Sequence, residues 1–204
     1  MRDRSSALPL LAAGLQAALL GIGCALLQVP TVPAVSWVCV MAVWAAGETH
    51  AREPLDGADE GDLASWVGVA SLLGLLGLAM ADAGSLPMSW LGTVGCATLL
   101  LAGAGLRVRA LRALGRAFRA KPHTAGAPVE EGPYAWVRHP AELGLMACAL
   151  GSAVCLGSLW AVVGALAVMP WVSDWRVRRE EAAMLHGADT QYGPYMTRVA
   201  RWGL

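Results

Sequence analysis

Long stretches without a charged residue dominate this sequence, and their length limits what the chain can fold into. The first of them, residues 7–29, is long enough to cross a hydrocarbon core of about 30 Å as a single helix. A shorter stretch at residues 32–47 and two further ones at residues 63–81 and 86–106 follow it. Overall, 56% of the 204 residues are hydrophobic and 15% are charged, whereas about a quarter of a soluble domain is charged. The sequence therefore predicts an all-α integral membrane helical bundle.

Residues 143–172 form the last apolar stretch, which is too long for one helix that crosses at ordinary tilt. Gly157 and Ser158 near its middle predict a turn, and Pro170 lies near its end. We therefore expect a C-terminal helical hairpin, whose second helix continues into the charged segment after Asp174. The bundle then has six membrane crossings, or five if one half of the hairpin only dips into the membrane.

The placement of the basic residues predicts the orientation. With six crossings and a cytoplasmic N-terminus, the external segments are residues 30–31, residues 82–85 and the tip of the hairpin. None of these contains Lys or Arg, so all 15 basic residues lie on the cytoplasmic side, as the positive-inside rule expects. Arg2 and Arg4 precede the first apolar stretch, which we interpret as a retained span and not as a signal peptide. Both termini are thus expected in the cytoplasm, and the Ala-, Gly- and Arg-rich composition favours a bacterial inner membrane.

We expect residues 1–204 to form one membrane domain in two parts. Residues 1–106 contain four spans, and residues 107–204 contain a basic amphipathic helix, the hairpin and most of the polar chemistry. Four arginines share one face of that amphipathic helix: Arg109, Arg112, Arg116 and Arg119. Three apolar residues share another: Leu111, Leu114 and Phe118. Such a helix is typical of the anionic surface of a membrane.

The cysteines and the net charge exclude several classes of site and partner. Five cysteines lie inside apolar stretches: Cys24, Cys39, Cys96, Cys148 and Cys155. Because no C-x-x-C pair occurs, the spacing indicates neither a disulfide framework nor a zinc site, and we expect all five to be small packing residues. A formal net charge of zero argues against a nucleic-acid partner. No metal is expected.

Two polar clusters remain in the second half of the chain. The first is G-P-Y-A-W-V-R-H-P-A-E-L at residues 132–143. The second is D-W-R-V-R-R-E-E-A-A-M-L at residues 174–185, followed by Q-Y-G-P-Y-M-T-R-V-A-R-W at residues 191–202. If the stretch between them is a hairpin, both clusters return to the same cytoplasmic end of the bundle and lie close together.

Each cluster also has a structural interpretation. Trp136 and Arg138 are residue types that anchor helices at a membrane interface. In the second cluster, the four-residue spacing of Arg176 and Glu180 allows a salt bridge along one helix, and Asp174 and Arg178 have the same spacing. Two clusters that converge on one end of a bundle nevertheless favour a functional site.

The motifs of this region resemble those of a known superfamily. L-G-R-A-F, V-E-E-G-P-Y-A-W-V-R-H-P-x-x-x-G, R-x-x-x-E-E and two tyrosines three residues apart occur in this order within residues 114–202. The set resembles the signature of the isoprenylcysteine carboxyl methyltransferase and phospholipid methyltransferase superfamily. The resemblance implies a small helical membrane enzyme that transfers a methyl group from S-adenosylmethionine. The cofactor is then expected to enter from the cytosol, and a lipophilic acceptor to enter from the bilayer among the membrane lipids.

The resemblance also implies which residues form the cofactor pocket. One wall contains Tyr134, Arg138, His139 and Pro140; the opposite wall contains Arg176, Glu180 and Glu181, with Tyr192 and Tyr195 in a C-terminal lid. These residue types suit the cofactor, because Arg or protonated His binds its carboxylate and Glu accepts hydrogen bonds from its ammonium or ribose hydroxyls. The candidate catalytic residues are Arg138, His139 and Glu142. Arg138 would hold a carboxylate acceptor, whereas His139 or a Glu would remove the proton of a phenol or amine.

Glu142 is the main departure from the superfamily pattern, which commonly has an aromatic residue two positions after R-H-P. We expect it to be a favourable acid in the first turn of a helix, with a different acceptor as the alternative. A lesser departure is H-G-A-D at residues 186–189, although the spacing from Glu181 to Tyr192 is preserved. The favoured reaction is O-methylation of a carboxylate or hydroxyl. Its acceptor is expected to be a lipophilic small molecule or a prenyl-cysteine-like group. Phospholipid N-methylation and thiol S-methylation are alternatives; a nicotinamide-dependent reductase and a non-catalytic membrane component are alternatives from other classes.

Overall fold

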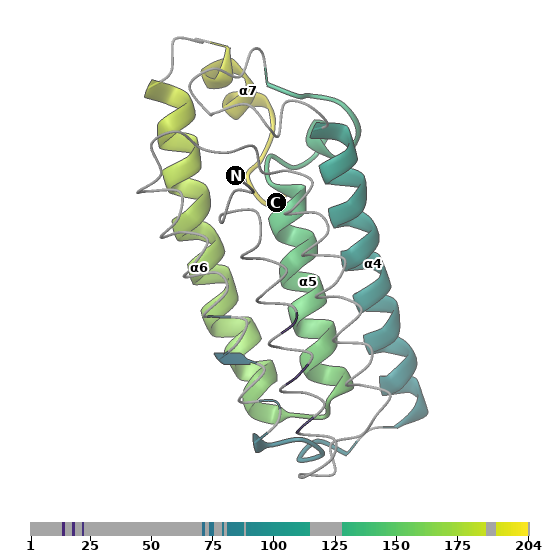
Figure 1. Cartoon of the computed structure of the whole chain (residues 1–204). Coiled ribbons are helices and arrows are strands. Elements are labelled where there is room, and N and C mark those ends of the chain that lie inside the picture. The colour runs from purple at the N-terminus through teal and green to yellow at the C-terminus, as the bar shows by residue number, and fades with distance from the viewer. Residues whose placement is uncertain are drawn as a thin grey trace, which may run out of the picture.

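The computed structural model describes residues 81–87, 89–114, 128–186 and 191–203, together with isolated positions at 14, 18, 22, 71, 74, 75 and 79. The helices of this part are α4 (Trp90–Leu114), the 3₁₀ helix η3 (Gly132–Ala135), α5 (Pro140–Cys155), α6 (Leu159–His186) and α7 (Tyr192–Arg198). Figure 1 shows the three long helices running along one another, with α7 at one end. In the described part of the chain, the predicted all-α fold is therefore confirmed.

The number of membrane spans is tested for only part of the chain. Among the described residues, one helix, α4, is long and apolar enough to cross a membrane, and α5 is a shorter apolar helix. Large apolar side chains such as Leu101 of α4 and Trp171 of α6 are exposed, which suits an outer surface covered by lipid. The spans predicted at residues 7–29, 32–47 and 63–81 lie outside the described residues, apart from the isolated positions, so five or six crossings remain a prediction.

The predicted hairpin is confirmed. α5 ends at Cys155 and α6 begins at Leu159, and the intervening Gly157 has a φ of +63°, a left-handed conformation that glycine adopts without strain. Pro170 lies inside α6 without ending it, so the second helix of the hairpin continues through the charged segment. This continuity carries the acidic and basic side chains of α6 back to the start of α5.

Asp82 ties the segment before α4 to the tip of the hairpin. Its Oδ2 accepts hydrogen bonds from the hydroxyl of Ser85 at 2.7 Å and from the backbone N–H of Trp160 at 3.1 Å. The hydroxyl of Ser158 donates to the same oxygen at 3.4 Å. A carboxylate in this place satisfies backbone donors at the start of α6 and interacts favourably with the helix dipole.

Glycines allow α4 and α5 to approach closely. A Cβ atom added at Gly103 would lie 2.8 Å from the carbonyl oxygen of Gly144, and one added at Gly144 would lie 2.7 Å from the carbonyl oxygen of Gly103. Gly151 faces the backbone of Leu100 in the same way, at 3.0 Å. Backbone contact of this kind is typical of helices that associate within lipid. It fixes where α5 begins relative to α4, and so where the site lies.

One helix crosses the boundary predicted at residue 106, and the division of the domain into two parts at that residue stays a prediction. α4 continues without a break to Leu114, because nothing in the basic sequence after residue 106 ends a helix. Arg109 and Arg112 are exposed on this extension, as the amphipathic pattern predicts, whereas Arg107 is only 3% exposed and faces α5. The rest of the predicted amphipathic helix, residues 115–121, lies outside the described residues.

The expectation that all cysteines are simple packing residues is wrong for two of them. Cys96 of α4 and Cys155 at the end of α5 form a disulfide, with their Cα atoms 5.7 Å apart. The packing of the helices brings them together over a sequence separation of 59 residues, which no local spacing rule detects. Cys148 is a free, buried cysteine, as expected, and Cys24 and Cys39 lie outside the described residues.

Candidate active site

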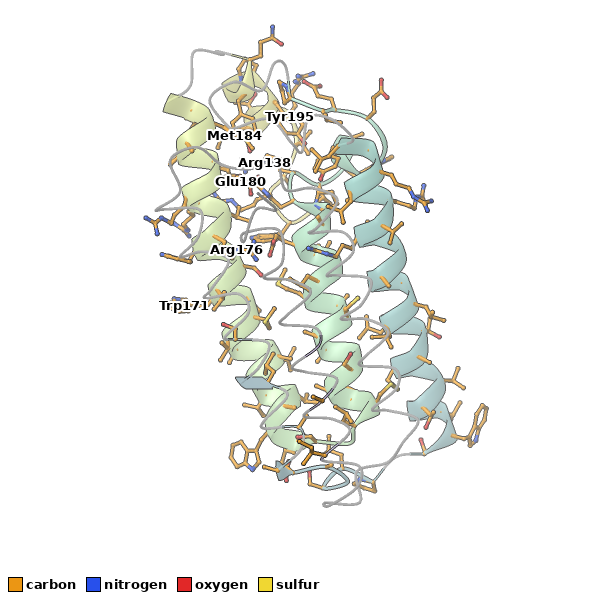
Figure 2. The ribbon with its side chains drawn as sticks, in the orientation of Figure 1. Arg138, Trp171, Arg176, Glu180, Met184 and Tyr195 are labelled. Atoms are coloured by element: carbon orange, nitrogen blue, oxygen red, sulfur yellow. A yellow bond between two sulfur atoms is a disulfide. The ribbon has the colours of Figure 1, made fainter. Side chains whose placement is uncertain are left out.

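The two polar clusters meet at the end of the bundle opposite the hairpin tip. His139 precedes the first residue of α5, and its Nε2 lies 3.1 Å from Oε1 of Glu181 on α6. Figure 2 shows Arg138, Arg176 and Glu180 together at this end, between α6 and the rest of the bundle. The predicted convergence of R-H-P with R-x-x-x-E-E is thus confirmed.

Glu181 is the centre of this site, and we call the groups bound to it the Glu181 hub. Its carboxylate, with a side chain 4% exposed, contacts Nη1 of Arg138 at 2.8 Å and Nη2 of Arg201 at 2.5 Å, in addition to His139. Burial alone raises the pKa of a carboxyl group. Here the hydrogen bond from Arg201 and the charges of Arg138 and His139 outweigh burial, so the pKa of Glu181 lies below its usual value. Glu181 is therefore an ionised structural centre whose oxygens are already bonded.

Arg201 is a member of the hub that sequence reasoning missed. Besides its contacts with Glu181, its Nη1 lies 3.1 Å from Oδ1 of Asp174. The same C-terminal segment is held by the backbone, since the N–H of Arg138 donates to the carbonyl of Ala200 at 3.0 Å. The ring of Trp202 lies 6.3 Å from that of His139. The only signal for Arg201 was a basic residue that follows an acidic motif, and its spacing predicts no contact.

The tyrosines that were predicted to form a lid are packed against one another and against η3. The hydroxyl of Tyr195 donates to the backbone carbonyl of Tyr134 in η3 at 2.8 Å, and the rings of Tyr192 and Tyr195 are 5.8 Å apart. All three are buried, and desolvation raises the pKa of Tyr195 to about 12, so its phenol is neutral at physiological pH. Pro140 is also buried and opens α5, where its fixed φ suits the first position of a helix.

Glu180 differs from its neighbour because it remains accessible. Its side chain is 49% exposed, and its contact with Nδ1 of His139 is 3.8 Å, beyond hydrogen-bond distance. Desolvation by the surrounding protein, together with the negative charges of Glu142 and Glu181, raises the pKa of Glu180. His139 and, to a lesser extent, Arg176 act in the opposite direction without reversing the shift of this pKa. Of the two adjacent glutamates, Glu180 is therefore the one that can bind a ligand.

Glu142 occupies the predicted first turn of α5, but it does more than stabilise the end of a helix. Its Oε1 lies 3.3 Å from Nη1 of Arg176, and its Oε2 accepts a hydrogen bond from the hydroxyl of Ser173 at 3.2 Å. Helical spacing allowed Arg176 to pair with Glu180 along α6. Arg176 contacts Glu142 across the helices, although its charge also acts on Glu180. The expected pair of Asp174 and Arg178 is confirmed at 2.5 Å.

Arg107 extends the charged region into α4. Its guanidinium, which sequence reasoning did not single out, donates from Nη1 to the carbonyl of Ala141 at 3.0 Å. The close approach of α4 and α5 buries it under the first turn of α5, because Gly144 lets the two backbones come together beside it.

These features define a helical protein of membrane type with a dense charged site at one end of its bundle. Residues 87–187, about half of the chain, match the phospholipid methyltransferase family, and the chain belongs to this family of membrane methyltransferases. Methyltransferases of this family generally use S-adenosylmethionine, and the name of the family implies lipid substrates. The match includes α4, α5 and α6 but ends before α7 and Arg201. No curated protein and no solved structure gives a significant match to the chain.

Proposed function

We propose that this protein uses S-adenosylmethionine to methylate a lipophilic acceptor at the cytoplasmic face of a membrane, most simply on a carboxylate or hydroxyl oxygen. The observation that supports this is the convergence of Arg138 and His139, just before α5, with Glu181 of α6, all within the residues matched by the family. Methyl transfer needs alignment of the reactants and exclusion of water more than it needs a chemically reactive side chain. A rigid charged site beside a lipid-facing bundle suits that requirement.

The charges of the site fit the cofactor. Nε of Arg138 is buried and has no hydrogen-bond partner among the described residues, and a buried donor without a partner costs about 1–3 kcal/mol. A carboxylate such as that of the cofactor would satisfy it. The accessible carboxylate of Glu180 can accept hydrogen bonds from an ammonium or from ribose hydroxyls. The cofactor supplies an electrophilic methyl group on a sulfonium, whose positive charge also favours a site with an ionised carboxylate.

The remaining residues then divide into two groups. Glu181 and Arg201 hold Arg138 and His139 in place, because they are paired with them or with each other. Tyr134, Pro140, Arg176 and Tyr192 are proposed to shape the cofactor pocket around Arg138, His139, Glu180 and Glu181. Of the proposed catalytic residues Arg138, His139 and Glu142, the first two belong to the hub, whereas Glu142 lies closer to the hairpin tip.

The disulfide supports the proposed orientation. Cys155 ends α5 next to the tip of the hairpin, at the opposite end of the bundle from the hub. Disulfides persist in oxidising compartments such as the bacterial periplasm and are rare in the cytosol. An external hairpin tip therefore agrees with a charged site that opens to the cytoplasm, where the cofactor is made.

Calorimetric titration of the purified protein with S-adenosylhomocysteine, in several detergents and in lipid, tests the proposal. We expect binding to the wild type and a loss of affinity of at least about tenfold, or roughly 1.4 kcal/mol, in R138A and E181A. R198A is the matched control, because Arg198 forms an exposed salt bridge with Glu130 away from the hub. Absence of binding in every medium, or equal losses in all three variants, would contradict the proposed function.

A further inference from the structure

The outer face of α6 changes from apolar to basic along one line of side chains. Trp160, Trp171 and Arg178 are exposed and follow one another at intervals of about three and two helical turns, so they point to the same side of the helix. Figure 2 shows Trp171 on the side of α6 that faces away from α5. Arg179 is exposed next to Arg178, so this face ends in two adjacent arginines.

The apolar part of this face is about as long as a membrane is thick. Arg178 follows Trp160 by 18 residues, or about 27 Å of helix, against about 30 Å for a hydrocarbon core. α4 has the same pattern, since Trp90 is exposed at its start and Arg109, its first exposed arginine, follows 19 residues later, or about 28 Å away. Trp and Arg are typical of the two membrane interfaces. Arg109 and Arg178 therefore lie at the level of the lipid phosphates on the side of the hub.

The two arginines of α6 are held in a way that suits binding of a phosphate. The side chain of Arg178 is 68% exposed, and its contact with Asp174 uses Nε, which in the described part of the chain leaves its two terminal nitrogens for a further acceptor. The guanidinium of Arg179 lies over the ring of Trp175, 5.1 Å from the ring centroid. Such stacking orders an exposed guanidinium without using its N–H groups. The oxygens of a phosphodiester can accept two parallel hydrogen bonds from one guanidinium.

The charge of this face favours an anionic lipid over a zwitterionic one. Arg178 and Arg179 stand beside one acid, Asp174, which is shared with Arg201 through a contact of 3.1 Å. The exposed carboxylate of Glu180 lies on another side of α6, toward the hub. The outer face of α6 therefore carries more positive than negative charge at the phosphate level. It attracts a lipid head with a net negative charge, whereas it repels the ammonium of a zwitterionic head.

We propose that Arg178 and Arg179, with Trp175, form an accessory site for the phosphate of an anionic phospholipid in the cytoplasmic leaflet. This lipid takes no part in methyl transfer, because it lies on the outer face of α6, whereas the side chain of Glu181 at the centre of the hub is 4% exposed. The bound lipid holds α6 at a fixed depth and so keeps the hub at the membrane surface. The inference does not rest on the proposed function, since it requires neither cofactor nor turnover.

Native mass spectrometry tests the site by counting the lipids that stay bound to the purified protein. The protein is given equimolar dioleoyl phosphatidylglycerol and dioleoyl phosphatidylcholine in detergent, and we expect the wild type to retain the anionic lipid with at least about tenfold preference. R178Q/R179Q removes both charges at similar size and should lower this preference at least about fivefold, with the exposed arginines of α4 accounting for the rest. R198Q is the matched control, because Arg198 is an exposed arginine of α7 paired with Glu130, and it should leave the preference unchanged.

Thermal unfolding of the wild type in detergent provides a second measurement, with phosphatidylglycerol, phosphatidylcholine or inorganic phosphate added. We expect phosphatidylglycerol to stabilise the protein most, and about 0.5 M salt to remove its advantage, because exposed charges are screened. An advantage that persists in salt, or equal stabilisation by inorganic phosphate, overturns the inference. This measurement decides the question even if R178Q/R179Q does not fold.

The lipid counts can overturn the inference in three ways. The wild type may retain the two lipids equally, R178Q/R179Q may keep the full preference, or R198Q may lose as much of it as the double variant. Calorimetry with S-adenosylhomocysteine on the same samples separates the accessory site from the hub. If the wild type binds S-adenosylhomocysteine, R178Q/R179Q should bind it within about twofold of the wild type, and a larger loss in this variant alone overturns the accessory role.

Discussion

Replacement of Arg201 by alanine tests the Glu181 hub at a residue that lies outside the region matched by the family. The change removes the contacts of Nε and Nη2 with Glu181 and that of Nη1 with Asp174. Hydrogen bonds to charged groups contribute about 1.5–3 kcal/mol each when buried, and loss of one partner of a buried pair costs about 3–5 kcal/mol. Arg201 is 25% exposed, and Glu181 keeps Arg138 and His139, so we expect about 2 kcal/mol of lost stability.

The pH dependence of this loss identifies its origin. The pKa of Glu181 is lowered in the folded protein, so its stabilising effect is present above the unfolded pKa of about 4.3 and disappears as the pH falls through the folded value. The difference in unfolding midpoint between wild type and R201A, measured by circular dichroism in detergent, should therefore be largest near neutral pH. It should shrink in acid, where a protonated Glu181 no longer attracts Arg201.

Two further variants complete the test. R201K keeps a positive charge without the forked geometry of a guanidinium, so it should restore only part of the stability. R198A removes an exposed salt bridge with Glu130 and should cost no more than about 1 kcal/mol. If R201A is as stable as R198A at every pH, the contacts of Arg201 with Glu181 do not contribute to the fold, and the hub as described is refuted.

Three other predictions concern the bundle and its pH response. G103A places a Cβ atom against the backbone of α5 and should destabilise the protein by about 1–3 kcal/mol. The Cβ atom of G105A meets no atom within 4 Å, so this variant should be neutral or more stable by up to about 1 kcal/mol. Thermal unfolding of the two variants measures both effects. The raised pKa of Glu180 predicts that affinity for the cationic cofactor increases as the pH rises through that pKa, because the ionised carboxylate of Glu180 binds the cofactor. Calorimetry at several pH values should show this increase in the wild type and its absence in E180Q. Loss of the Cys96–Cys155 disulfide in a double serine variant should cost about 2–4 kcal/mol, seen as a lower unfolding midpoint that reductant does not change further.

Local patterns predicted the path of the chain well. The uninterrupted apolar stretch with Gly157 and Ser158 at its middle predicted the hairpin, and the hairpin alone was sufficient to place R-H-P beside R-x-x-x-E-E. Hydrophobicity and turn residues act over short distances along the chain, so a single sequence reveals them directly. The position of the site at one end of the bundle follows from them.

The choice of partners within the site could not be predicted in the same way. Helical spacing paired Arg176 with Glu180, but that rule ignores Glu142, which becomes a neighbour only once α5 packs on α6. The same limit explains Arg201, whose partners Glu181 and Asp174 are brought to it by the fold. Which of several charged residues becomes the partner in a salt bridge depends on burial, and burial is a property of the packed bundle.

The Glu181 hub makes the site a single cooperative unit. It joins the residues before α5, the charged part of α6 and the segment after α7 through one carboxylate. If any one segment detaches, the nearly buried carboxylate of Glu181 loses one of its positively charged partners. The loss of that partner also weakens the bonds of Glu181 to the others. Partly assembled forms of the site are therefore sparse, and amide hydrogens in these three segments exchange with solvent through one shared opening event, not independently.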